Sequence, residues 1–286
     1  MARGLDHIVH AVRDLDAAAT AYQRLGFSVG ARNRHPWGTH NRLVQFPGFF
    51  IELLTVAEPE KLGGDALSRL FGAPSRDFLS KHEGFWALLL ESRDAAGDAA
   101  QFAGAGIAAA PAVRFEREGR RPDGTTVKVA FSLAFARDAA ADAGFAVCQQ
   151  HFPENFWNPA FQSHRNGAVA VAGVVMVAEN PSDHHVFLSA FTGERELLAT
   201  SNGIAVKTPR GTIEVMTPAA YASHFGVAAP DIAEGARLAA LILAVRDGAS
   251  LATMLADANI GMASRMGRIV VGPQTMMGAA IVFEQG

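Results

Sequence analysis

The spacing of hydrophobic and polar positions changes several times along the first 56 residues. A run rich in Ile and Val covers 5–12, and this composition predicts a strand. Over 15–25, apolar residues recur every three or four positions behind Asp14, which is typical of an amphipathic helix with an N-cap. Gly26 is a stop signal for that helix. Extended patterns follow at 27–31, 39–46 and 49–56, so the predicted order is β-α-β-β-β.

The same order recurs three more times. We predict strands at 85–91, 107–116, 125–135, 145–151, 169–177, 197–200, 203–208, 211–216, 237–245, 260–266, 268–271 and 277–283. Helices are predicted at 93–105, 186–191 and 250–258, with a further helix at 66–71 and a turn at 120–124. The tetrapeptide Ala-Val-Arg-Asp at 11–14 reappears at 244–247, which supports an internal repeat of four units.

The units are expected to form two domains. Residues 152–159 hold two prolines and two asparagines and lack periodicity, so we place the join there. The predicted domains are 1–157, with units one and two, and 166–286, with units three and four.

Composition and charge exclude several classes of protein. A hydrophobic fraction of 49% supports a packed core and excludes intrinsic disorder. The net charge of −3, without a basic run, disfavours nucleic acid and anionic membranes as partners. The longest apolar run, 168–178, is shorter than the roughly 20 residues that span a bilayer. With one cysteine, Cys148, and no apolar signal core, we expect a cytoplasmic protein whose Cys148 is a small buried residue.

Three segments of the first unit carry a family resemblance: Leu5-Asp6-His7-Ile8-Val9, Gly38-Thr39-His40-Asn41 and Phe50-Ile51-Glu52-Leu53-Leu54. They resemble the vicinal oxygen chelate superfamily, and in particular its glyoxalase-like and bleomycin-resistance-like domains. The resemblance implies an α+β fold in which βαβββ units pair around cupped mixed sheets, with the site inside the cup. Fold alone does not fix function in such a superfamily, so the site residues must carry the argument.

The resemblance implies a divalent metal (Zn, Fe, Mn or Ni) held by His7 on the first strand and Glu52 on the fourth. An imidazole nitrogen and a carboxylate oxygen suit these metals, and Glu52 is also the candidate general base. The second unit has Ala87 where a histidine is expected and Cys148 opposite Glu52. A third ligand would therefore come from Gln150 or, after a shift of the strand by one residue, from His151; binding without metal stays open.

Aromatic and histidine side chains are candidates for a substrate pocket. They lie in the turn before the third strand and at the domain join: His35, Trp37, His40, Phe152 and Trp157. The alternative is a structural turn in the first case and packing between domains in the second. The charged run 117–121 is typical of a solvated hairpin tip.

These observations favour a metal-dependent enzyme of the isomerase or lyase type that acts on a small oxygenated metabolite. The alternative is a metal-free protein that binds or sequesters a small molecule. A ring-cleaving dioxygenase site in the C-terminal half is disfavoured, because Gly173 and Ala240 stand where the resemblance requires histidines and only Glu284 remains. That half is expected to be a degenerate supporting domain, or one through which a homodimer forms.

Overall fold

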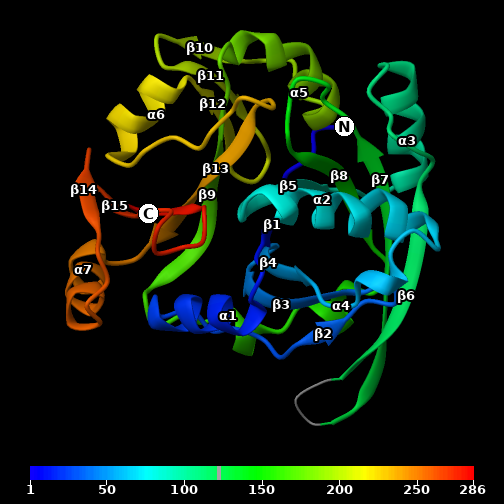
Figure 1. Ribbon diagram of the computed structural model, residues 1–286, viewed down its shortest axis with the longest axis horizontal. Coiled ribbons are helices and arrows are strands. Elements are labelled where there is room, and N and C mark those ends of the chain that lie inside the picture. Colours follow the sequence, from blue (N-terminus) through cyan, green and yellow to red (C-terminus); the bar gives the residue numbers. More distant parts are fainter. Residues whose placement is uncertain (121–123) are drawn as a thin grey trace.

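The computed structural model describes residues 1–120 and 124–286, with Arg120 described by its backbone alone. The turn predicted at 120–124 therefore falls largely on 121–123, outside the described residues. Two eight-stranded sheets account for most of the chain (Figure 1). The first has the order β2-β3-β4-β1-β5-β8-β7-β6, and the second has the order β10-β11-β12-β9-β13-β16-β15-β14.

The strands of the first sheet are β1 (Leu5–Ala11), β2 (Asn33–Arg34), β3 (Thr39–Phe46), β4 (Phe49–Val56), β5 (Gly84–Glu91), β6 (Val113–Arg120), β7 (Thr126–Ala136) and β8 (Gly144–Gln150). Those of the second are β9 (Ala168–Val177), β10 (Leu198–Thr200), β11 (Gly203–Lys207), β12 (Thr212–Met216), β13 (Arg237–Val245), β14 (Ala263–Arg265), β15 (Arg268–Val271) and β16 (Ala280–Gln285). The α-helices are α1 (Leu15–Arg24), α2 (Ala73–Lys81), α3 (Ala95–Gly104), α4 (Pro153–Phe156), α5 (His185–Thr192), α6 (Pro218–Phe225) and α7 (Gly248–Asp257).

Both sheets are built in the same way from two units. The first strands of the two units pair antiparallel at the centre, β1 with β5 and β9 with β13. Each of these strands also pairs in parallel with the last strand of its own unit, such as β1 with β4 and β13 with β16. The predicted α+β fold of four βαβββ units, paired around two curled mixed sheets, is confirmed.

An aspartate begins the helix of three of the four units. The side chain of Asp14 accepts hydrogen bonds from the backbone N–H groups at the start of α1, and Asp94 and Asp247 cap α3 and α7 similarly. Such caps satisfy N–H groups that have no partner within the helix. The helices predicted at 15–25, 93–105 and 250–258 therefore form close to their expected bounds.

Several elements differ from expectation. No strand forms over 27–31, and β6 begins six residues later than predicted because Pro111 cannot donate a backbone hydrogen bond to a sheet. The helix expected at 66–71 continues through a π-helical turn at Ser68–Gly72 into α2. Pro74 is tolerated there because it lies in the first turn of α2.

One face of each sheet contributes to a single hydrophobic core that both halves share. Phe27 of the first half stacks on Phe283 of the second, with ring centroids 6.1 Å apart. Phe145 on β8 packs against Phe187 and Phe191 on α5. The two halves are therefore joined by buried aromatic side chains, while the boundaries at 157 and 166 stay predictions.

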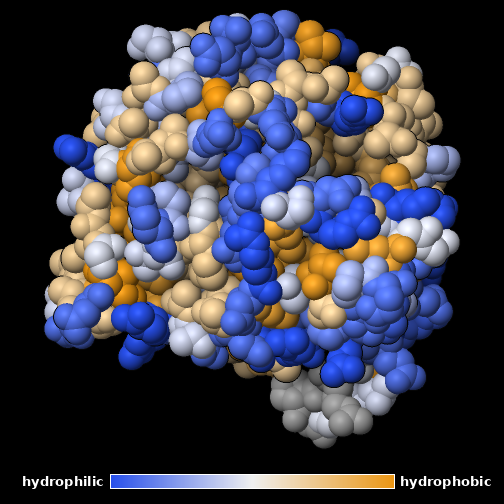
Figure 2. Space-filling view, in the orientation of Figure 1, coloured by the Kyte–Doolittle hydropathy of each residue, from blue (hydrophilic) through white to orange (hydrophobic). Residues whose placement is uncertain are grey.

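Helices also lie against the opposite faces of the sheets. Figure 1 shows α2 crossing in front of the first sheet and α6 lying beside the second. On the face seen in Figure 2, hydrophilic and hydrophobic residues are mixed, and hydrophobic residues reach the surface next to α2. Within the described residues, no helix is both long and apolar enough to cross a membrane.

Candidate active site

A cavity of about 50 Å³ lies in the cup of the first sheet, on the side that faces α2. Its polar lining residues are His7, His35, Asn41, Glu52, Arg117 and Cys148. Its aromatic lining residues are Trp37, Phe50, Phe71, Phe115, Phe131 and Phe156. The cup therefore combines a few converging polar groups with an apolar wall, which is the usual composition of a small-molecule site.

A β-bulge in β1 turns two neighbouring residues toward this cup. Leu5 pairs with Leu90 and His7 pairs with Leu89, so Asp6 is an extra residue between them. Leu5 and Ile8 consequently both face the shared core. Sequence reasoning missed Asp6, because regular alternation would have placed it on the opposite face from His7.

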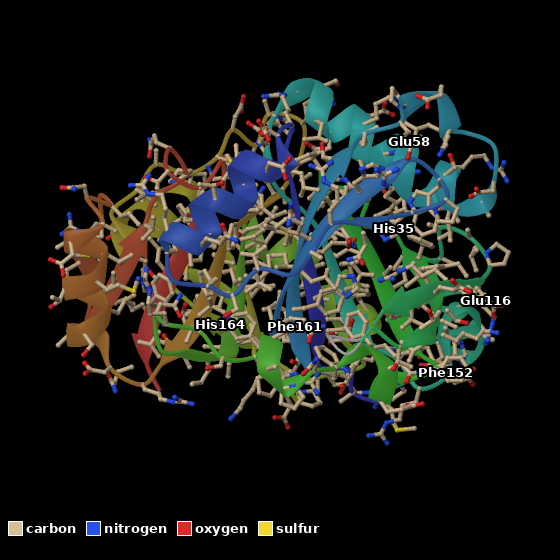
Figure 3. All side chains as sticks on the ribbon, turned by 90° about the horizontal axis from the view of Figure 1, so that it is seen from below. His35, Glu58, Glu116, Phe152, Phe161 and His164 are labelled. Atoms are coloured by element: carbon tan, nitrogen blue, oxygen red, sulfur yellow. The ribbon has the colours of Figure 1, made fainter. Side chains whose placement is uncertain are left out.

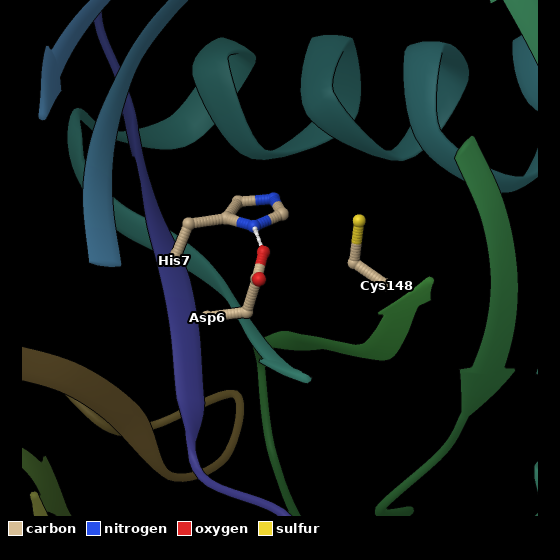
Figure 4. A group of neighbouring side chains, drawn as sticks. All are labelled: Asp6, His7 and Cys148. Carbon is tan, nitrogen blue, oxygen red and sulfur yellow. Dashed lines mark hydrogen bonds and ion pairs between the residues drawn. The ribbon is translucent and has the colours of Figure 1, made fainter. Parts of the chain in front are cut away.

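The His7 ring is held on two sides. Its Nδ1 lies 2.6 Å from Asp6 Oδ2, within hydrogen-bonding distance, as Figure 4 shows, and the ring stacks on Phe50 at a centroid distance of 4.2 Å. An ionised carboxylate only accepts hydrogen bonds, so Nδ1 is the donor. His7 Nε2 then faces Glu52 Oε2 across 4.0 Å, because β1 and β4 are adjacent parallel strands.

The carboxyl group of Glu52 is buried and held from the side opposite His7. Asn41 Nδ2 donates to Glu52 Oε1 at 2.5 Å, and His35 Nε2 lies 3.9 Å from the same oxygen. Burial raises the pKa of Glu52, while His7 and the Asn41 hydrogen bond oppose this rise. Burial also lowers the pKa of His35 to about 3, so His35 is neutral at pH 7.

Cys148 brings a sulfur atom to the same place from β8. Asp6, His7 and Cys148 each offer one potential ligand atom, and these atoms lie within 4.8 Å of one another (Figure 4). Burial and the nearby charges of Asp6 and Glu52 raise the pKa of the Cys148 thiol well above its usual value. The thiol is therefore protonated unless a cation lies beside it. Cys148 is buried, as expected.

These groups fit a divalent metal ion. The 4.0 Å between His7 Nε2 and Glu52 Oε2 does not exceed the sum of two ligand bonds of about 2.0–2.2 Å each. Asp6 holds the other nitrogen of the His7 ring, as second carboxylates commonly do for metal-binding histidines. An imidazole nitrogen together with a carboxylate oxygen suits Zn, Fe, Mn or Ni.

The two candidates for a third ligand occupy different places. Gln150 lies on the same face of β8 as Cys148, and its Nε2 donates to Asp6 Oδ1 at 3.2 Å. His151 Nε2 instead forms a hydrogen bond with Ser132 Oγ at 2.8 Å, and His151 does not line the cavity. The one-residue shift that would bring His151 inward is absent, since β8 pairs in unbroken register with β7.

Of the expected pocket residues near the third strand, two line the cavity and one does not. His35 and Trp37 stack on each other at 4.5 Å and form part of the wall. His40 points to the other face of β3 from Asn41, where its Nε2 pairs with Glu58 Oε1 at 2.9 Å. The structure thus places His40 outside the cup.

A second cavity of about 440 Å³ adjoins the first and shares Leu43, Arg117 and Phe156 with it. Trp157 lines this outer cavity, whereas Phe152 lines neither. In Figure 3, His35 lies toward the centre of the first half, and Phe152 and Glu116 lie toward its outer edge. The join between the halves therefore contributes Phe156 and Trp157 to the mouth of the cup.

Arg117 corrects the expectation of a solvated hairpin tip. It is half-buried on β6, and it is the one cationic side chain among the described residues that line the inner cavity. The sequence does not reveal this, because the charged run does not show that β6 continues to Arg120 and keeps Arg117 within the strand.

Side chains occupy the cup of the second sheet. Tyr221 and Phe225 of α6 pack against β9 and β13. Glu284 is paired with Arg268 at 2.8 Å, and Ala240 is buried in the same cluster. The degenerate character expected for the C-terminal half stays a prediction.

Comparison with known families agrees with this architecture. The family described as "Glyoxalase-like domain" matches residues 5–192, about two thirds of the chain. The chain belongs to this family. No curated protein matches the sequence.

Solved structures share the fold over the whole glyoxalase-like chain. A hypothetical protein from Staphylococcus aureus is 14% identical, with a TM-score of 0.71, over 99% of this chain and 100% of its own. A mutant of 4-hydroxymandelate synthase from Streptomyces coelicolor is 10% identical, with a TM-score of 0.59. The match covers 100% of this chain and 93% of the synthase chain. The 2,2',3-trihydroxybiphenyl 1,2-dioxygenase from Sphingomonas wittichii is 13% identical, with a TM-score of 0.55. The match covers 100% of this chain and 91% of the dioxygenase chain. At such identities these likenesses show the fold alone.

Proposed function

We propose that this glyoxalase-like protein is a divalent-metal-dependent enzyme of the isomerase or lyase type that acts on a small oxygenated metabolite. The observation that carries the proposal is the approach of His7 Nε2 to Glu52 Oε2, at 4.0 Å, with His7 Nδ1 bound to Asp6. A metal ion held there would supply a Lewis acid for two adjacent oxygens of the substrate.

The protein's own groups would handle the proton. Burial raises the pKa of Glu52, so its carboxylate accepts a proton more readily than an exposed glutamate would. The hydrogen bond from Asn41 fixes the orientation of this carboxyl group. The apolar wall of Trp37, Phe71 and Phe131 excludes water, which strengthens these polar interactions.

A substrate screen with Glu52→Gln tests the proposal. Metal-loaded protein is assayed against α-dicarbonyl compounds and other small molecules with vicinal oxygens. We expect turnover that disappears with a chelator and falls about 10²–10⁴-fold in Glu52→Gln, the range for loss of a general base. Glu58→Gln, at a glutamate outside the cup, is the matched control and should retain activity. Turnover that survives both metal removal and Glu52→Gln would overturn the proposal.

A metal-free binding protein is the second candidate. The observation that favours it is the apolar surface of the second unit, where Leu89 and Leu133 line the cavity without a histidine. Binding of an aromatic ligand that is unchanged when the metal is removed, together with no turnover in the screen, would favour this function.

A further inference from the structure

The guanidinium group of Arg117 reaches the inner cavity with part of its hydrogen-bonding capacity unused. Its Nη1 donates to the backbone oxygen of Glu118 at 3.2 Å, whereas its buried Nε has no hydrogen-bond partner. A buried N–H group without a partner is costly, and few occur in native proteins. This edge of the guanidinium is therefore available to a ligand.

The position of Arg117 separates it from the other charged residues of β6. Residues alternate across the strand, so Phe115 and Arg117 face the cup while Arg114 and Glu116 face outward. Arg114 and Lys128 pair with Glu116 on that outer side. Burial lowers the pKa of Arg117, and the nearby charge of Glu52 opposes this shift. Arg117 thus faces the candidate active site rather than the surface ion pairs.

The surroundings of Arg117 are aromatic. Phe115 packs edge-on against Trp37 at 4.9 Å and stacks on Phe131 at 5.2 Å. Phe156 approaches Phe131 at 5.5 Å from the join between the halves. Arg117 and Phe156 both line the inner and the outer cavity, so a molecule that enters the cup passes them.

We infer that Arg117 binds the carboxylate of an aromatic or similarly planar acid whose oxygenated end reaches His7 and Glu52. The flat guanidinium matches the geometry of a carboxylate and is weakly hydrated, so it suits an anion in an apolar setting. The phenylalanine and tryptophan rings would hold the planar body of the ligand. This inference rests on the proposed function for the location of the reacting groups, and it adds the class of substrate.

Binding of two probes of almost equal shape tests the inference. Benzoate and its neutral counterpart benzamide are titrated into the full chain after metal has been removed by dialysis. Trp37 and Trp157 line the two cavities, so tryptophan fluorescence reports occupancy. We expect benzoate to bind roughly tenfold more tightly than benzamide, as a charge-assisted hydrogen bond would give.

Variants assign this preference to Arg117. Arg117→Gln should abolish the preference for benzoate and leave the affinity for benzamide unchanged. Arg114→Gln, three residues earlier on the outward face, is the matched control and should behave as wild type. Equal affinities in the wild type, a preference that survives Arg117→Gln, or no binding of either probe would overturn the inference.

Failure of this inference is distinguishable from failure of the proposed function. The probes are measured without metal, so a protein that never binds metal can still prefer benzoate through Arg117. Conversely, a protein that binds metal and turns over substrate but shows no preference for benzoate would contradict the role of Arg117 alone.

Discussion

Two histidines on β1 illustrate how neighbouring residues can have different roles. His7 faces the cup, where its ring is fixed by Asp6 and stacked on Phe50. His10 faces the shared core, where Nδ1 pairs with the Tyr22 hydroxyl at 2.9 Å and Nε2 with the Met277 oxygen at 3.1 Å. A carbonyl oxygen only accepts, so Nε2 of His10 carries the proton, and Nδ1 accepts from Tyr22. His10 is therefore a structural group that needs to be neutral.

The buried His10 predicts a loss of stability in mild acid. Burial lowers the pKa of His10 to about 4, whereas an unfolded histidine titrates near 6.5. Between these values the unfolded chain binds a proton that the folded chain does not, so the free energy of unfolding falls as the pH is lowered.

Protonation linked to His10 should lower the free energy of unfolding by about 2 kcal/mol between pH 7 and pH 5. Urea unfolding of the wild type and His10→Gln at both pH values measures the effect. The decrease should be smaller by that amount in His10→Gln, and comparing each protein with itself cancels any constant destabilisation by the substitution. An equal decrease in both proteins would contradict the assignment of His10.

At the scale of elements, local patterns predict much of the fold. The strand at β1 and the helix α1 follow from apolar spacing, an aspartate cap and a glycine stop that lie close together in the chain. His7 and Glu52 are likewise recognisable, because the family pattern places one residue on the first strand and the other on the fourth. The bulge at Asp6 was not predictable, since it depends on the register of β1 against β5, more than 70 residues away in the chain.

The mouth of the cup depends on contacts that are still more distant in sequence. Gln45 Nε2 donates to the Phe156 oxygen at 3.0 Å, and Gln45 Oε1 accepts from the Asn158 N–H at 3.3 Å. These bonds attach the join segment to β3 and bring Phe156 over the cup. A proline-rich segment without periodicity indicates a connection, but its packing partner is set by the tertiary fold. The position of Phe156 could not be read from residues 152–159 alone.

At the scale of the whole molecule, the two halves share a fold but differ in what occupies the cup. The first cup keeps a cavity with converging polar groups, and Tyr221 and Phe225 fill the second. The repeated sequence pattern therefore predicts the paired architecture correctly. The helix α6, which the pattern does not predict, supplies the side chains that distinguish the second cup from the first.

The shared core predicts that the two halves unfold together. All three tryptophans lie in the first half, at positions 37, 86 and 157, so their fluorescence reports the unfolding of that half. Phe191 belongs to the second half but packs against Phe145 and Phe102 of the first. Phe191→Ala should therefore lower the stability measured by tryptophan fluorescence by about 3–5 kcal/mol, the usual cost for a buried phenylalanine.

Val186→Ala is the control for this experiment, because Val186 is an exposed residue on the same helix. Its substitution should change the transition little. If Phe191→Ala leaves the unfolding transition of the tryptophans unchanged, the halves unfold independently. That result would contradict the prediction that they unfold together.

His7 and Glu52 form the proposed divalent metal site in the first cup. Elemental analysis of the full chain, purified without chelator and reloaded with Zn, Mn, Fe or Ni, tests it most directly. We expect about one metal ion per chain in the wild type and in the control His151→Ala, whose histidine lies outside the cavity. His7→Ala and Glu52→Gln should each lose the ion while remaining folded by circular dichroism. A wild type that binds no metal, or folded variants that retain it, would contradict the claim.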